Sequence, residues 1–148
     1  MLSSALLKLG EPDLRLARLR LWIHGREREH LESDWLEATA HCGDFNANVT
    51  VTGSFLQLTE LERWCSDAEK LLVEDVGEAN LECAEPHLSV KLNGTKLGQI
   101  TMEVSITPDQ SSQHHWFRFD IDQSYLPPFI AQCRSIVDAH SIGANRER

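Results

Sequence analysis

Apolar and polar residues alternate with a period of two along several segments in the first third of the chain. Residues 18–24 place an aliphatic side chain at every second position, and residues 35–42 repeat this pattern. A shorter alternation covers residues 48–52 and ends at Gly53-Ser54. A period of two is typical of a strand with one buried face, so these segments predict three strands.

The period changes to that of a helix from Leu58 to Gly77. Apolar side chains there follow the i, i+3, i+4, i+7 rule and form one stripe, which consists of Leu61, Trp64, Cys65, Ala68, Leu71 and Leu72. Thr59 followed by Glu62 fits a capping box, because the threonine oxygen accepts the N3 amide while the glutamate reaches back to the cap. Gly77 suits the C-terminal end. We expect one helix that packs this stripe against a core.

Four further segments alternate with a period of two after this helix. They cover residues 79–83, 88–92, 98–107 and 116–122. Asn93-Gly94 separates the second segment from the third, and this dipeptide is typical of a two-residue hairpin turn. Neighbouring antiparallel strands are therefore expected.

A second helix is predicted over residues 127–140, with two prolines in its first turn, where a missing N–H costs little. Strands and helices thus follow one another without regular βαβ alternation. This order predicts an α+β fold in which an antiparallel sheet of about seven strands carries two helices on one face. Residues 1–148 form a single domain in this prediction, with a core of about residues 14–140. We expect residues 1–12 and 141–148 to be loosely ordered.

The net charge of the chain is more informative about its partners than its overall composition is. The content of 41% hydrophobic and 25% charged residues is ordinary for a globular protein, but the net charge is −9. Residues 59–85 hold nine acids against Arg63 and Lys70. Such a surface repels phosphate backbones, so we expect no nucleic-acid partner. The chain shows neither a secretory signal nor an apolar run of the roughly eighteen residues that a membrane span needs, so we expect a cytoplasmic protein without membrane contact.

The acids of this region divide into two groups. Three pairs at helical spacing can neutralise one another, namely Glu60–Arg63, Arg63–Asp67 and Lys70–Glu74. Six acids have no such partner: Glu62, Glu69, Asp75, Glu78, Glu82 and Glu85. We predict that these six bind a basic surface of a protein partner. The alternative, that they serve only solubility, stays open.

Cysteines and histidines offer little chemistry at their spacings. Cys42, Cys65, Cys83 and Cys133 form no CxxC pair, and each falls in phase with the apolar face of its own element. The seven histidines show no HExxH pattern, and the chain has neither a glycine-rich phosphate loop nor a GxSxG turn. We therefore expect structural thiols, with no catalytic residue, no metal and no cofactor.

The stretch HHWFRFDIDQSYLPPF, which starts at His114, gathers two histidines, two aspartates, an arginine and a tyrosine. Its His114, Asp120 and Asp122 suggest a small metal-dependent hydrolase as a less favoured alternative. At a period of two, however, Arg118 stands beside Asp120 on one strand face, where it pairs with the carboxylate and competes with any cation. Asp122 or the nearby serine can instead cap the final helix. The stretch is therefore better explained as a strand, a capped turn and a helix start.

Three tryptophans, Trp22, Trp35 and Trp116, fall on the polar faces of their strands. We expect this side of the sheet to be partly solvated or available to another chain. A homodimer, or an interaction subunit without independent activity, is therefore a second hypothesis.

Segments along most of the chain resemble a known family: LRLWIHGRE (19–27), AEPHLSVKL (84–92) and ITMEVSITPDQSSQHHWFRFDIDQSYLPPFIAQ (100–132). On these segments the chain resembles the WapI-like bacterial immunity proteins, over about residues 14–140. The resemblance implies a cytoplasmic, non-enzymatic protein that binds and neutralises the C-terminal domain of a contact-dependent or secreted polymorphic toxin, often a nuclease. An acidic antagonist fits such a partner, because it attracts the basic cleft with which a nuclease holds its substrate.

Overall fold

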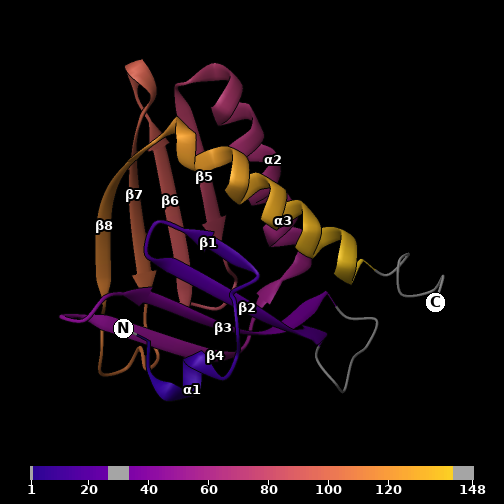
Figure 1. Ribbon diagram of the computed structural model, residues 1–148, viewed down its shortest axis with the longest axis vertical. Helices are drawn as coiled ribbons and strands as arrows, with labels where there is room; N and C mark the ends of the chain where they lie inside the picture. The colour runs from indigo at the N-terminus through magenta and orange to yellow at the C-terminus, as the bar shows by residue number, and fades with distance from the viewer. Residues whose placement is uncertain (1, 27–33, 142–148) are drawn as a thin grey trace.

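The computed structural model describes residues 2–26 and 34–141, which form two antiparallel sheets and three helices (Figure 1). A short helix, α1 (Ser4–Leu7), precedes the first sheet, whose strands are β1 (Leu14–Leu16), β2 (Leu19–Arg26), β3 (Trp35–Gly43) and β4 (Asn48–Gln57). Helix α2 (Leu58–Glu74) leads to the second sheet, whose strands are β5 (Gly77–Glu82), β6 (Leu88–Gly94), β7 (Gln99–Ile106) and β8 (Trp116–Asp122). The short 3-10 turn η1 (Lys96–Gly98) precedes β7, and β8 is followed by η2 (Gln123–Tyr125) and helix α3 (Leu126–His140). None of the helices in these ranges is long and apolar enough to cross a lipid bilayer.

The predicted α+β class with antiparallel strands is confirmed. Each sheet contains four strands in chain order, β1-β2-β3-β4 and β5-β6-β7-β8. The described chain thus has eight strands, because β1 adds a short edge strand to the segments that the alternation predicts. The two sheets meet where β4 approaches β7, and in Figure 1 the strands of one sheet run across those of the other.

One hydrophobic cluster joins both sheets and both long helices. It contains the inner positions of the predicted strands, among them Leu36, Ala38 and Ala40 in the first sheet and Val90 and Val104 in the second. All five side chains are fully buried, with 0% exposure. Removal of such apolar surface from water is the main favourable contribution to folding. The period of two in the sequence therefore corresponds to the inner faces of the two sheets.

Each long helix packs against the sheet formed by the other half of the chain. Helix α2 follows the first sheet and lies against β5 of the second, whereas α3 follows the second sheet and lies against β1 and β2 of the first. The two helices also contact each other, and the ring centroids of Trp64 and Phe129 are 4.6 Å apart. Both halves thus repeat one order, four strands and then a helix, with the helices exchanged (Figure 1).

Helix α2 begins earlier than its sequence pattern predicts. Gln57 is the N-cap, and its amide donates to Glu60 Oε1 at 2.7 Å, so Glu60 is the acid of the capping box. Thr59 lies inside the first turn and donates its hydroxyl to Asp34 Oδ2 at 2.5 Å. The predicted box of Thr59 and Glu62 is therefore wrong by two residues, because the helix starts directly where β4 ends.

The predicted turn at Asn93-Gly94 is also wrong. Both residues belong to β6, where they pair with β5 and β7, and the chain reverses at residues 95–98. The Thr95 amide donates to Gln99 O at 2.9 Å across this turn. Glycine at the end of β6 serves close packing instead, because a Cβ on Gly94 would lie 2.4 Å from Leu71 Cδ1 of α2.

The tryptophans do not share one exposed face. Trp22 is only 3% exposed, because the N-terminal segment lies against it and its Nε1 donates to Gly10 O at 3.1 Å. Trp116, at the start of β8, is 51% exposed. The expectation that Trp22 lies on a solvated face is therefore wrong: a segment that precedes the first sheet covers that side of β2.

Candidate functional site

Acidic side chains line a groove between α2 and β5, with a volume of about 210 Å³. We call it the α2–β5 groove. Its lining consists of Glu60, Arg63 and Asp67 from α2 and of Glu78, Asn80 and Glu82 from β5.

Regular spacing on each element brings these side chains together. Steps of three and four residues place the α2 members on one helix face, and steps of two place the β5 members on one strand face. On the buried side of α2, Trp64 donates its Nε1 hydrogen to Ala79 O of β5 at 3.2 Å. This hydrogen bond fixes the helix against the strand, so the two outer faces adjoin along the groove.

Carboxylates outnumber cations among the groove residues by four to one. Arg63 forms no ion pair in the described part of the chain, where the two ion pairs are Arg18–Asp44 and Arg134–Glu69. Exposed side chains gain little from such contacts in water. The ion pairs predicted from helical spacing are accordingly not formed among the described residues. These are Glu60–Arg63, Arg63–Asp67 and Lys70–Glu74. The groove therefore keeps most of its negative charge.

Two groove residues, Glu60 and Asn80, differ in the hydrogen bonds that their side-chain oxygens accept. The Glu60 carboxylate accepts hydrogen bonds from the amides of Gln57 and Ala84, both at 2.7 Å, so its position is fixed. Asn80 Oδ1 is buried and has no hydrogen-bond partner among the described residues. A buried acceptor without a donor costs free energy. Asn80 is thus a groove residue whose buried oxygen is unsatisfied by the described residues.

The structure brings only part of the predicted partner-binding set together. Glu78 and Glu82 line the groove. Glu62 is exposed on α2, and Glu85 is exposed in the connection after β5, but neither lines it. These four acids are available to solvent or to another molecule.

The other two predicted residues are engaged within the chain. Glu69 forms an ion pair with Arg134 of α3, and this bond raises the pKa of the Arg134 guanidinium. Asp75 is the C-cap of α2 and accepts a hydrogen bond from Gln123 of η2. Both acids therefore connect α2 with the C-terminal part of the fold.

Four groove residues lie outside the predicted partner-binding set: Glu60, Arg63, Asp67 and Asn80. Glu60 and Asp67 were expected to pair with Arg63, and Asn80 had no predicted role. Their spacing along α2 and β5 is visible in the sequence, and this spacing is the signal that could have found them. What the sequence does not show is that α2 packs against β5.

The stretch from His114 onward forms a strand edge and a helix start. His114 is exposed before β8, and Asp120 is exposed on it. Asp122 accepts the Ser124 amide at 2.8 Å and also its hydroxyl, and these bonds lower the pKa of the carboxyl. The expected ion pair between Arg118 and Asp120 is absent from the described residues. Among these residues, no group of three or more His, Cys, Asp or Glu side chains is placed to hold a metal ion.

The cysteines are free thiols in apolar surroundings. Cys42, Cys65 and Cys133 are buried, and Cys83 is half-buried. Burial raises the pKa of the Cys42 thiol to about 12 and raises the pKa of the other three as well. Because the thiolate is the reactive form, these thiols are poor nucleophiles and poor metal ligands.

Comparison with known proteins places this fold in a family. A family model described as the Immunity protein WapI-like family matches residues 13–140. No curated protein and no solved structure matches the chain. The match runs from the start of β1 to the end of α3 and so includes both sheets and both long helices. The chain therefore belongs to the Immunity protein WapI-like family.

Proposed function

We propose that this protein is a non-enzymatic immunity protein that binds and neutralises the C-terminal domain of a cognate polymorphic toxin, a nuclease. The match of residues 13–140 to an immunity-protein family carries the proposal. The α2–β5 groove supplies its contact surface, together with the exposed acids Glu62 of α2 and Glu85 of the connection after β5. Action inside the cytoplasm belongs to the same proposal.

Electrostatics supports a basic partner at this surface. The groove residues Asp67, Glu78 and Glu82 make no ion pair with any described residue. A nuclease binds phosphates through a positively charged cleft, so the two surfaces attract each other and speed association. The acids also occupy the place of the substrate phosphates. Occlusion of the cleft then requires no chemistry by the immunity protein.

The test measures association of the protein with a toxin domain that the proposal expects to be encoded beside its gene. The double variant Glu78→Gln/Glu82→Gln is expected to lower the association rate constant about tenfold at low salt and to weaken its salt dependence. A matched control, Glu103→Gln/Asp120→Asn, removes the same charge from β7 and β8, which lie two and three strands away from β5 in that sheet. This control is expected to bind like the unchanged protein.

Two results would contradict the proposal. The immunity function is wrong if the unchanged protein shows no binding to the toxin domain at micromolar concentration and no protection of cells that produce it. The assignment of the groove is wrong if the control variant slows association as much as the Glu78/Glu82 variant does.

A further inference from the structure

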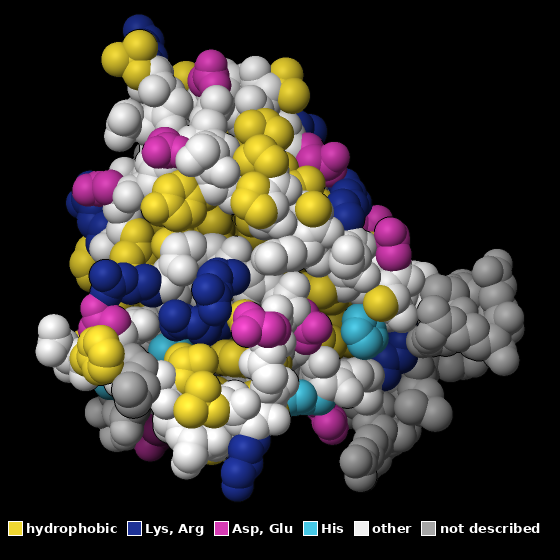
Figure 2. Space-filling model, in the orientation of Figure 1, with side chains coloured by type: hydrophobic (Ala, Val, Ile, Leu, Met, Phe, Trp, Pro, Cys, Tyr) yellow, Lys and Arg dark blue, Asp and Glu magenta, His cyan; other side chains and the backbone are white. Residues whose placement is uncertain are grey.

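Arginines gather around the turn between β1 and β2, although the chain as a whole is acidic. Three adjoining hollows of about 340, 570 and 340 Å³ meet there: the first two share Arg18, and the last two share Ala17 and Tyr125. The charged residues that line them are Arg15, Arg18, Arg20, Asp44, Arg118 and Asp120. We call this surface the arginine face. Figure 2 shows Lys and Arg side chains side by side over this part of the molecule, next to hydrophobic side chains.

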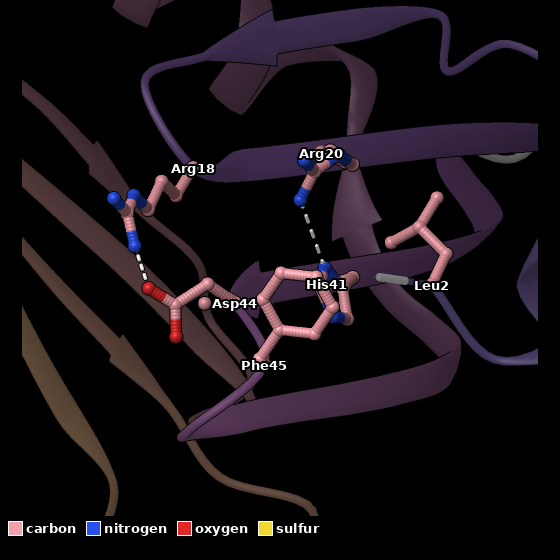
Figure 3. A pocket seen from close by; sticks show the side chains of 7 residues that line it. Leu2, Arg18, Arg20, His41, Asp44 and Phe45 are labelled. Atoms are coloured by element: carbon pink, nitrogen blue, oxygen red, sulfur yellow. Dashed lines mark hydrogen bonds and ion pairs between the residues drawn. The ribbon is translucent and has the colours of Figure 1, made fainter.

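Arg20 has a buried guanidinium nitrogen without a hydrogen-bond partner among the described residues. It is half-buried in the first hollow, and its Nη1 lies 3.3 Å from His41 Nδ1. The unpaired nitrogen is Nε. Asp44, the carboxylate of that hollow, pairs with Arg18 instead (Figure 3). Burial, followed by repulsion from Arg15, lowers the pKa of Arg20. A half-buried guanidinium with a buried, unpaired nitrogen is favourable for binding an anion that supplies the missing acceptor.

An exposed aromatic ring flanks this site. Phe45 extends from the turn after β3 and is 76% exposed, and Figure 3 shows it beside His41, with Leu2 on the other side of the histidine. Arginine and aromatic side chains are enriched at the energetic centres of protein interfaces. The composition of the arginine face therefore fits a protein partner.

The middle hollow runs along a free sheet edge. Strand β8 has β7 as its one neighbour in the sheet, and the hollow is lined by β8 residues on one side and by Ala17 and Arg18 on the other. The bond from the Ile106 amide to His115 O places the odd-numbered residues of β8 in hydrogen-bonded pairs with β7. The backbone groups of Trp116, Arg118 and Asp120 therefore point away from β7. They are available to an extended chain.

We propose that the arginine face docks an extended acidic segment of a protein partner. The segment pairs with the outer edge of β8, and one of its Asp or Glu side chains enters the first hollow. There the carboxylate accepts hydrogen bonds from Arg20, whose Nε is otherwise unpaired. The charge of this partner segment is opposite to that of the surface expected at the α2–β5 groove, so the inference does not depend on the proposed toxin.

The probe is the peptide acetyl-TVEVT-amide, compared with acetyl-TVQVT-amide and with inorganic phosphate. Each is titrated into the full ¹⁵N-labelled protein, and NMR follows the Arg20 Nε–Hε signal and the backbone amides of Trp116, Arg118 and Asp120. The glutamate peptide is expected to shift all four signals. The four titrations should fit the same dissociation constant, in the millimolar range. The glutamine peptide is expected to bind about tenfold more weakly, because it lacks the charge that Arg20 recognises.

Variants locate the binding. Arg20→Gln is expected to remove most of the affinity, and Arg118→Gln, on an exposed position of β8, to weaken it about threefold. Arg63→Gln, in the α2–β5 groove, is the matched control and is expected to bind the peptide unchanged. Because Arg118 is exposed, its variant tests the proposal even where Arg20→Gln disturbs folding.

Three results would overturn the inference. The carboxylate site is wrong if the glutamate peptide leaves the Arg20 signal unmoved or binds no better than the glutamine peptide. Docking along β8 is wrong if Arg20 shifts while the amides of Trp116, Arg118 and Asp120 do not. Tighter binding of phosphate than of the glutamate peptide would assign the hollow to a free anion.

Discussion

Replacement of Glu60 by alanine tests the start of α2 and the closure of the α2–β5 groove together. The Glu60 carboxylate accepts the Gln57 amide at the helix cap and the Ala84 amide beyond β5, both at 2.7 Å. It thereby joins three segments: the end of β4, the first turn of α2 and the connection after β5. Alanine at this position leaves both amides without their acceptor.

The expected loss follows from these two hydrogen bonds. Loss of a helix cap costs about 1 kcal/mol. A hydrogen bond to a charged acceptor contributes roughly 1.5–3 kcal/mol, and the lower end applies because Ala84 is exposed and water can replace the carboxylate. We therefore expect Glu60→Ala to lower the free energy of unfolding by about 2–3 kcal/mol.

Urea unfolding, followed by tryptophan fluorescence, measures this loss as a lower midpoint with an unchanged slope. Glu62→Ala is the matched control, because Glu62 is an exposed acid two positions further along the same helix. Its effect is expected to stay below about 0.5 kcal/mol. A larger loss for Glu62→Ala than for Glu60→Ala would place the cap where the sequence pattern predicts it. A loss below about 0.5 kcal/mol for Glu60→Ala would refute the role of both hydrogen bonds.

Three further predictions concern titration, thiols and the helix contact. Burial, followed by repulsion from Arg20, lowers the pKa of His41. As the pH falls, the unfolded chain therefore takes up this proton at a higher pH than the folded protein does. The contribution of His41 to the free energy of unfolding is complete above the unfolded pKa of about 6.5 and is lost as the pH drops towards the folded pKa. His41→Gln should make the urea midpoint less dependent on pH between about 7 and 5.5, and an unchanged dependence would contradict this. The raised pKa of Cys42 and Cys133 should protect the native thiols from iodoacetamide at about pH 8, while all four cysteines react in urea, as mass spectrometry would show. Glu69→Ala should cost less than about 1 kcal/mol, because its ion pair with Arg134 is exposed, and a double-mutant cycle that gives a larger coupling would contradict this.

The inner faces of the strands could be predicted from the sequence because burial acts on each strand separately. Leu36 and Val90 are buried at the phase that the alternation predicts. The division into two sheets depends instead on contacts between distant segments, such as β4 with β7. The prediction of a turn at Asn93-Gly94 was wrong for a similar reason. Glycine occupies position 94 because Leu71 of α2, which is distant in the sequence, packs against it.

The acids illustrate the same limit. Glu78 and Glu82 line the same groove because they lie on one face of one strand, with Asn80 between them. Glu69 and Asp75 are also acids without a partner at helical spacing, but α3 and η2 provide their partners, Arg134 and Gln123, which lie 65 and 48 residues later in the chain. Which face of α2 remains free is therefore a property of the packed molecule.

The exchange of helices between the two halves makes the fold cooperative. If either half unfolds, its own helix leaves the other sheet, and that sheet loses the cover of its apolar face. Neither half then has a buried core of its own, so unfolding is expected as one transition. Any partner that binds the native state at one surface consequently stabilises both sheets, to an extent set by its concentration relative to its dissociation constant.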